Sequence, residues 1–264
     1  MSNRYANPEK EKAFRDALKV RPSSAIPLSF FQDNMIVCTG EDPKELTTAF
    51  KSSSLGKCLR YHQYRCYQAW KFSGITVVIT GIGTGCMEPL MWELLDHETL
   101  GDKRPKRLAM IGTAGYISDS GFGQVYVVDG AYPVGCGVRL HDDHLPVRPR
   151  FPGYAELGLP LAEEMSTDRY FTCTPAMTDP RKVLAKSHDP QLLEELEKYW
   201  KAGRLISMET LQFYHFAKMF GLPDTQYIAF RGVANLADQF ETQGDYSQQI
   251  LTDALSHAVE ALLK

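Results

Sequence analysis

Three short apolar runs in the sequence each end in a glycine-containing turn, and this pattern constrains the fold more than any other feature. The runs and their turns are Asn34–Thr39 with Gly40, Ile75–Thr80 with Gly81–Gly85, and Arg107–Ile111 with Gly112–Gly115. Parallel strands bring their carboxyl ends to one edge of a sheet, where glycine lets backbone N–H groups approach an anion or a sugar. The pattern predicts an α/β fold with a ligand site at that edge.

Strand and helix signals alternate along the rest of the chain. We expect further strands at Tyr64–Phe72, Gln124–Asp129, Tyr170–Thr174 and Tyr227–Val233, and helices at Pro43–Lys51, Pro89–Leu100, Leu159–Ser166, Leu192–Ala202, Met208–Phe220 and Asp245–Leu263. Such alternation is typical of a largely parallel sheet. We therefore predict one three-layer α/β domain over residues 31–264, with a twisted central sheet flanked by helices. Residues 1–30 are expected to form a surface arm with a short amphipathic helix near Glu9–Val20.

Charge and composition exclude several classes of partner. The 264 residues carry 29 Lys and Arg against 32 Asp and Glu, a net charge of −3, which gives no basic footprint for nucleic acid or for a membrane surface. No apolar run approaches the roughly 20 residues of a membrane span, and the charged N-terminus lacks the apolar core of a secretory signal. The six cysteines include no CxxC pair and suit reduced thiols. We expect a cytoplasmic protein with a small-molecule ligand.

The order and spacing of the motifs resemble those of the nucleoside phosphorylase superfamily, which includes uridine and purine phosphorylases and nucleosidases. The resemblance is carried by TVVITGIGTGCMEPLMWELL and LAMIGTAG within residues 76–115, by Ser207–Thr210 (SMET), and by Arg231–Asp238 (RGVANLAD). It implies cleavage of a nucleoside's N-glycosidic bond by a homo-oligomer, either a dimer or a trimer of dimers, with shared active sites. By the same resemblance Glu209 accepts hydrogen bonds from the ribose hydroxyls and Met208 packs on the sugar.

The residue expected to face the leaving base departs from the pattern of the purine-cleaving relatives. Those relatives carry an Asp where this chain has Asn235, and an amide cannot act as a general acid. Asn235 could still hold a 6-oxopurine through N7 and O6. Asp238, three residues later, is an alternative acid, although an Asp there could instead cap the following segment.

Other candidates for the base pocket come from the resemblance and from their position beside predicted strand ends. Gly115 lies in the third glycine turn, and Phe171 or Tyr170 lies at the end of a predicted strand. Arg181 falls near the base or the 5′ pocket, where a guanidinium could bind a 5′-phosphate with two parallel hydrogen bonds. No histidine of the N-terminal arm matches the one that relatives lend to the 5′-hydroxyl.

Part of a phosphate site is recognisable. In the phosphorylases a glycine turn, a hydroxyl and usually three arginines hold phosphate. Gly40 matches the glycine and Thr113 the hydroxyl, while Arg65 resembles the arginine that a neighbouring subunit contributes, with Arg60 as a competing candidate.

The other two arginines are missing. Met110 stands two residues before Gly112, where an arginine is expected, and either Lys44 or Glu45 replaces the arginine of the first turn. A phosphate dianion would then be poorly paired, and unpaired buried charge is unfavourable. Glu45 lies near the position at which hydrolytic relatives carry a water-activating glutamate. We therefore favour a nucleosidase acting on a purine nucleoside or nucleotide over a phosphorylase that takes inorganic phosphate as co-substrate. A non-catalytic nucleoside-binding protein is a second alternative.

No resident cofactor or metal is expected. The turn Gly81–Gly85 does not complete the dinucleotide fingerprint G-x-G-x-x-G, because Cys86 stands at its last position and no acidic strand end follows about 20 residues later. His141-Asp142-Asp143-His144 has the residue types of a metal site, but adjacent residues rarely converge on one ion.

Overall fold

The computed structural model describes residues 23–116, 121–134, 145–168, 205–236 and 244–264. The strands are β1 Asn34–Thr39, β2 Arg60–Tyr64, β3 Tyr67–Lys71, β4 Ile75–Thr80, β5 Arg107–Tyr116, β6 Val125–Pro133, β7 Leu161–Ser166, β8 Leu205–Ser207 and β9 Gln226–Leu236. The helices are α2 Pro43–Ser52, α3 Thr84–Leu95, α4 His97–Leu100, α8 Thr210–Phe220 and α9 Gly244–Leu263. Within these ranges no helix has both the length and the apolar character that crossing a membrane requires.

All the described strands belong to one sheet, in the order β2-β3-β4-β1-β5-β8-β7-β6-β9. Strand β9 also pairs with β5, so β5, β8, β7, β6 and β9 close on themselves, while β2, β3, β4 and β1 extend from β5 as an open wing. The pairs β4–β1, β1–β5, β5–β9, β6–β7 and β7–β8 are parallel. The antiparallel pairs are β2–β3, β3–β4, β5–β8 and β6–β9. The sheet is therefore mixed. The predicted turns at Gly40 and Gly81 follow the parallel strands β1 and β4, whereas the turn predicted at Gly112–Gly115 is wrong, because β5 continues through these residues to Tyr116 and pairs there with β9.

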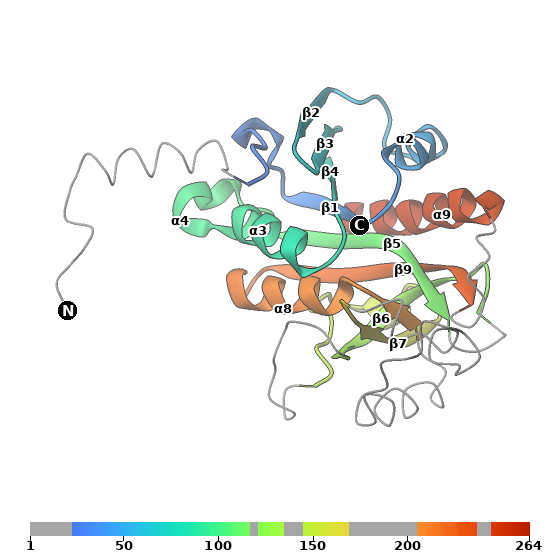
Figure 1. Cartoon of the computed structure of the whole chain (residues 1–264). Helices are drawn as coiled ribbons and strands as arrows, with labels where there is room; N and C mark the ends of the chain where they lie inside the picture. Colours follow the sequence, from blue (N-terminus) through green and yellow to red (C-terminus); the bar gives the residue numbers. More distant parts are fainter. Residues whose placement is uncertain (1–22, 117–120, 135–144, 169–204, 237–243) are drawn as a thin grey trace.

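Helices cover both faces of the sheet, which gives the predicted three layers (Figure 1). Helices α3 and α8 pack on one face of the sheet and share one apolar cluster with it. Helices α2 and α9 pack on the other face and share a second apolar cluster with it. In β1, Met35 and Val37 face α3 and α8, whereas Ile36 and Cys38 face α2 and α9, because successive side chains of a strand alternate. Thr39 continues the first face at the carboxyl end, and it lies in the candidate site described below.

The end of the expected N-terminal arm is tied to the core. Ile26 and Phe30 are buried, and the fully buried carboxylate of Glu93 in α3 accepts hydrogen bonds from the backbone N–H groups of Ser23 and Ser24 at 2.6 and 3.0 Å. The Ser24 hydroxyl donates a further bond to Glu93 at 2.6 Å. This carboxylate anchors residues 23–30 to α3.

Several predicted elements need correction. The helix predicted at Leu159–Ser166 is strand β7, because these residues pair with β6 and β8 and tertiary pairing outweighs a weak helical pattern. The strand predicted at Tyr64–Phe72 contains the turn of a hairpin, with Arg65 at φ +53° between β2 and β3. The helix predicted from Pro89 begins five residues earlier, directly after the glycine turn. The elements predicted at Glu9–Val20, Tyr170–Thr174 and Leu192–Ala202 lie outside the described residues.

Candidate active site

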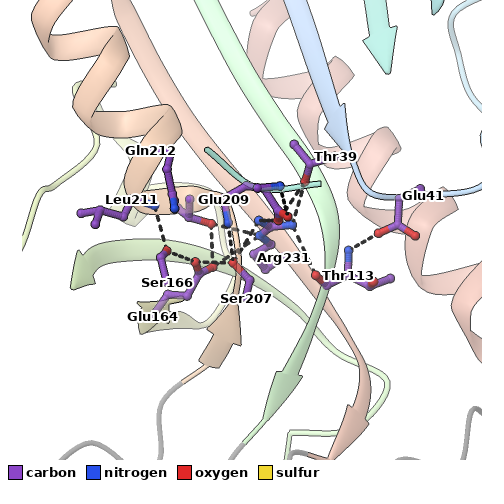
Figure 2. Close-up of polar contacts among 12 residues, drawn as sticks. Thr39, Glu41, Thr113, Glu164, Ser166, Ser207, Glu209, Leu211, Gln212 and Arg231 are labelled. Atoms are coloured by element: carbon purple, nitrogen blue, oxygen red, sulfur yellow. Dashed lines mark hydrogen bonds and ion pairs between the residues drawn. The ribbon is translucent and has the colours of Figure 1, made fainter. Parts of the chain in front are cut away.

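Glu209 lies where β8 passes into α8, at the carboxyl edge of the sheet. The residue is 5% exposed, and its side chain does not cap its own helix. One carboxylate oxygen, Oε2, accepts from Arg231 Nη2 at 2.9 Å and from the Thr39 hydroxyl at 3.4 Å. The other, Oε1, accepts from the backbone N–H of Gly83 at 3.3 Å. The carboxylate therefore lies where α8, β1, β9 and the second glycine turn converge (Figure 2).

Arg231 is the central cation of this group. It projects from β9 and is fully buried. Its guanidinium group donates to Thr210 Oγ1 at 3.0 Å, Thr39 Oγ1 at 3.2 Å, the Thr113 carbonyl at 3.3 Å, Ser207 Oγ at 3.0 Å and Glu209 Oε2 at 2.9 Å. A guanidinium has five N–H donors, so each has an acceptor within the protein.

A second buried carboxylate, Glu164 of β7, lies on the other side of Arg231. Its Oε2 is 3.3 Å from Arg231 Nε. Burial alone would lower the pKa of Arg231, but the negative charges of Glu164 and Glu209 outweigh that effect and raise it. The guanidinium thus neutralises part of the charge of two carboxylates, and removing it would leave both of them buried without a counter-ion, which is strongly destabilising.

The close approach of Arg231 explains why residue 112 of β5 is a glycine. A Cβ atom on Gly112 would lie 2.4 Å from Arg231 Nη1 and 3.0 Å from Thr39 Oγ1. Gly112 pairs with Arg231 in the β5–β9 register, so the guanidinium folds back over the glycine of the neighbouring strand. Glycine is needed here for space rather than for an unusual backbone angle.

Glu41 marks the first glycine turn. Gly40 has φ +71°, and its N–H donates to the Thr80 carbonyl at 3.3 Å, which turns the chain away from β1. Glu41 Oε1 then accepts the backbone N–H of Thr113 at 2.5 Å, which links the first glycine turn to strand β5 (Figure 2). Burial raises the pKa of Glu41, although the Thr113 donors and Arg231 offset part of the increase.

Sequence reasoning missed Glu41 and placed the acidic candidate at Glu45. Glu45 lies in the first turn of α2, is partly exposed, and its backbone carbonyl accepts from Gln248 Nε2 at 3.0 Å. It is close enough to Glu41 to contribute to the raised pKa of that residue. The sequence did hold one indication of Glu41, because this residue directly follows Gly40, the glycine of the turn after β1.

The predicted anion-binding residues are only partly brought together. Gly40 lies in the turn after β1 and Thr113 lies in β5, and Glu41 joins the two, whereas Met110 is fully buried in the apolar cluster under α3 and α8. Arg65 is exposed in the β2–β3 turn, with its guanidinium 5.2 Å from the centre of the Tyr64 ring. Arg60, the competing candidate, donates to the Ser29 hydroxyl at 3.0 Å. The role predicted for Arg65 needs a second subunit and stays a prediction.

The residues predicted for the sugar and the base are described to different extents. Met208 is partly buried beside Glu209. Gly115 pairs with Asn235 across β5 and β9, so both backbones lie near the carboxyl edge, and Gly115 also pairs with Ile206 of β8. Phe171, Arg181 and Asp238 lie outside the described residues.

The metal candidate His141–His144 also falls outside the described ranges. Among the residues that the structure describes, no three His, Cys, Asp or Glu side chains are grouped to hold a metal ion.

Comparison with known proteins shows the fold. No protein-family model matches the chain, and no curated protein matches it. Among solved structures, it is similar to the purine nucleoside phosphorylase of Toxoplasma gondii in complex with immucillin-H, with a TM-score of 0.61 and 16% identity over 91% of this chain and 96% of that one. It is also similar to the Plasmodium knowlesi homologue of the Plasmodium falciparum PNP, with a TM-score of 0.58 and 14% identity over 91% of this chain and 93% of that one. The resemblance to the nucleoside phosphorylase superfamily is thereby confirmed at the level of the fold.

Proposed function

We propose that this chain, which has the nucleoside phosphorylase fold, hydrolyses the N-glycosidic bond of a purine nucleoside or nucleotide. The observation that carries the proposal is the hydrogen bond from the Thr113 N–H to Glu41. A phosphate held by residues Gly112–Gly115 of β5 would need this donor, and a carboxylate already accepts it. A dianion placed there would also meet a like charge, which is unfavourable in a partly buried site.

The cationic side chains beside Gly112 also favour water over phosphate as the nucleophile. Arg231 is the guanidinium beside Gly112, and its five N–H groups donate to protein acceptors. Met110 contributes an apolar side chain to the core on the same face of β5. Releasing Arg231 to bind phosphate would leave Glu164 and Glu209 without their shared counter-ion, which is strongly destabilising for buried carboxylates.

In the proposed reaction, water replaces phosphate as the nucleophile. Glu209 accepts a hydrogen bond from a ribose hydroxyl, and the sugar develops positive charge as the bond to the base breaks. Glu41 takes a proton from the water that attacks C1′, which forms the new C1′–O bond. The bonding electrons leave with the base, which takes up a proton from solvent as it departs, and the proton on Glu41 returns to solvent, so that one water is consumed in total. A raised pKa makes the Glu41 carboxylate a stronger base near neutral pH.

Arg65 supports the companion proposal that the protein works as a homo-oligomer. This arginine is exposed on the β2–β3 hairpin, beside the exposed apolar side chains Leu59, Tyr61 and Tyr64. In an oligomer the hairpin of one subunit would contact the next and carry Arg65 toward its site. Sedimentation analysis checks the oligomeric state, and a purely monomeric active enzyme would contradict it.

Phosphorolysis and non-catalytic binding are the two alternatives. The matching structure from T. gondii was solved with immucillin-H, which makes this compound a suitable binding probe. Release of base is to be measured from inosine, adenosine, uridine and AMP, with and without phosphate, beside a thermal-shift assay with immucillin-H. Release without phosphate supports hydrolysis, whereas strict dependence on phosphate contradicts it. A thermal shift without any released base supports a binding protein.

A further inference from the structure

Glu164 has no part in the proposed reaction, and yet it is one of the most fully hydrogen-bonded side chains of the site. It lies on β7 and is fully buried. Its Oε1 accepts from the hydroxyls of Ser166 and Ser207 at 2.7 and 2.5 Å. Its Oε2 accepts from Thr210 Oγ1 at 2.6 Å and lies 3.3 Å from Arg231 Nε. A carboxylate has about four lone-pair positions, and these four contacts fill them.

The contact with Arg231 fixes the rotation of the guanidinium. This group is planar, so holding the Nε edge determines where the two Nη nitrogens point. With Nε beside Glu164, Nη2 donates to Glu209 and Nη1 to Thr39. The position of the Glu209 carboxylate thus depends on an ion pair formed on the opposite edge of Arg231.

Glu164 also holds the backbone that carries Glu209. Ser166 and Thr210 donate their hydroxyl protons to Glu164, and Ser166 Oγ accepts the Leu211 N–H at 2.9 Å. The first turn of α8 therefore has one of its free N–H groups satisfied from β7 rather than by its own N-cap residue. The Glu209 side chain is left available for a ligand.

We propose that Glu164 is a positioning residue for Glu209, acting through Arg231 and through the start of α8. The inference rests on the proposed function in one respect, namely that Glu209 accepts a hydrogen bond from a sugar hydroxyl. Glu164 itself contacts no substrate in this account. Glu164 acts only on the orientation of the Glu209 side chain and on the strength of the electrostatic interaction between Arg231 and Glu209.

Several charged and titratable groups determine the electrostatic environment of Glu209. Arg231 and Glu164 are described above, Glu41 interacts electrostatically with Arg231, and Cys38 and Cys86 are thiols within electrostatic range of Glu209. In Glu164→Gln one negative charge is removed from Arg231 while the side chain keeps its size. The Nε edge of Arg231 then loses its charged partner, so the guanidinium is no longer held in the orientation that points Nη2 at Glu209, and the surroundings of the Glu209 carboxylate change.

The test compares Glu164→Gln with Glu163→Gln. Glu163 is the preceding residue of β7, so it faces the other way, where its carboxylate contacts the Tyr132 hydroxyl at 3.2 Å and lies 3.7 Å from Arg148. The NMR chemical shift of the Glu209 side-chain carboxyl carbon at neutral pH, assigned with Glu209→Gln, should change in Glu164→Gln and stay unchanged in Glu163→Gln. An unchanged Glu209 signal in Glu164→Gln would overturn the proposal, and this measurement needs no activity.

The second readout is selectivity for the sugar hydroxyls. Glu164→Gln should lower kcat/KM for a ribonucleoside by about tenfold or more, the scale of one hydrogen bond to a charged group. It should have little effect on the matching 2′,3′-dideoxynucleoside, which offers Glu209 no hydroxyl. An equal loss on both substrates would indicate a merely structural role and overturn the proposal. If Glu164→Gln does not fold, Glu164→Asp, which keeps the charge and shortens the reach, should still lose activity on the ribonucleoside alone.

The two proposals fail in different ways. If the unmodified protein cleaves no nucleoside, the proposed function is wrong, while the carboxyl-carbon signal of Glu209 still decides whether Glu164 acts on it. If the protein cleaves ribonucleosides and Glu164→Gln behaves like Glu163→Gln, only the positioning role is wrong.

Discussion

The backbone N–H of Thr113 donates to the carboxylate of Glu41 at 2.5 Å, which joins the first glycine turn to strand β5. A carboxylate therefore accepts the hydrogen bond of a residue that the sequence motif predicts for phosphate. Since burial raises the pKa of Glu41, the same group is suited to take a proton. This one contact links the fold to the proposed hydrolysis.

Replacing Glu41 should separate it from the other acidic candidate. Loss of a general base typically lowers kcat by about 10²–10⁴, so Glu41→Gln should lose at least roughly a hundredfold in base release. Glu45→Gln should lose far less, because the Glu45 carbonyl rather than its carboxylate makes the described contact to Gln248. Steady-state kinetics of the two variants decide between the candidates, and a larger loss in Glu45→Gln would restore the sequence-based assignment.

The same substitution should stabilise the fold at neutral pH. The pKa of Glu41 is raised in the folded protein, so between the ordinary carboxyl pKa and the raised value the folded state binds more protons than the unfolded state. Stability attributable to this group therefore falls as pH rises through that window, and it is unaffected below it. Thermal unfolding of Glu41→Gln should show a higher Tm than the unmodified protein at pH 7 and the same Tm near pH 4. A lower Tm at pH 7 would show that the ionised carboxylate is needed for folding.

The acidic limb of the pH–rate profile should report the same group. Because Glu41 must be ionised to accept a proton, kcat/KM should fall as pH drops through its raised pKa, above the range of an ordinary carboxyl group. This limb should be absent from the residual activity of Glu41→Gln. A limb that persists unchanged in that variant would assign it to another residue.

Much of the layer architecture could be predicted from the sequence, because it depends on local patterns. The apolar runs Asn34–Thr39 and Ile75–Thr80 are strands with the predicted bounds, and each is followed by the predicted turn. Strand β7 was predicted as a helix because its pairing with β6 and β8 is a tertiary effect that no local pattern contains. The turns after β1 and β4 and the position of Glu209 could be found by motif, whereas the turn predicted at Gly112–Gly115 is part of β5.

The contacts between distant residues that assemble the candidate site could not be predicted in the same way. The Glu41–Thr113 and Arg231–Glu164 contacts join residues about 70 positions apart, and nothing in either local stretch indicates its partner. Arg231 stood at the start of a recognised motif, but its role follows only from the β5–β9 register that brings it over Gly112. The register of the strands, rather than the amino-acid composition, determines which charged side chains lie next to one another across a sheet.

Gly112→Ala tests the close approach of Arg231. The added Cβ would lie 2.4 Å from Arg231 Nη1, so the guanidinium must move and its hydrogen bonds to Thr39 and Glu209 should weaken. Overpacking of this kind costs about 1–3 kcal/mol, measured as the free energy of unfolding in urea. Gly85→Ala is the matched control, since a Cβ there meets nothing within 4 Å. Equal stabilities of the two variants would contradict the packing described.

Met110 distinguishes an apolar core position from a lost phosphate ligand. Met110→Leu should cost less than about 1.5 kcal/mol, because volume-conserving exchanges are tolerated in cores. Met110→Arg should be strongly destabilised, since it places a second guanidinium in the apolar cluster on the face where Arg231 is already buried. A stable Met110→Arg variant whose base release became dependent on phosphate would show instead that the position still belongs to an anion site.

The central claim is that water, and not phosphate, attacks C1′. Base release from a purine ribonucleoside is to be run in H₂¹⁸O with phosphate present, and the sugar product analysed by mass spectrometry at early times, with an unlabelled-water and a no-enzyme control for exchange at C1′. The account predicts free ribose that carries ¹⁸O as it forms, at the same rate with and without phosphate. Ribose 1-phosphate as the product, formed only when phosphate is added, would contradict it.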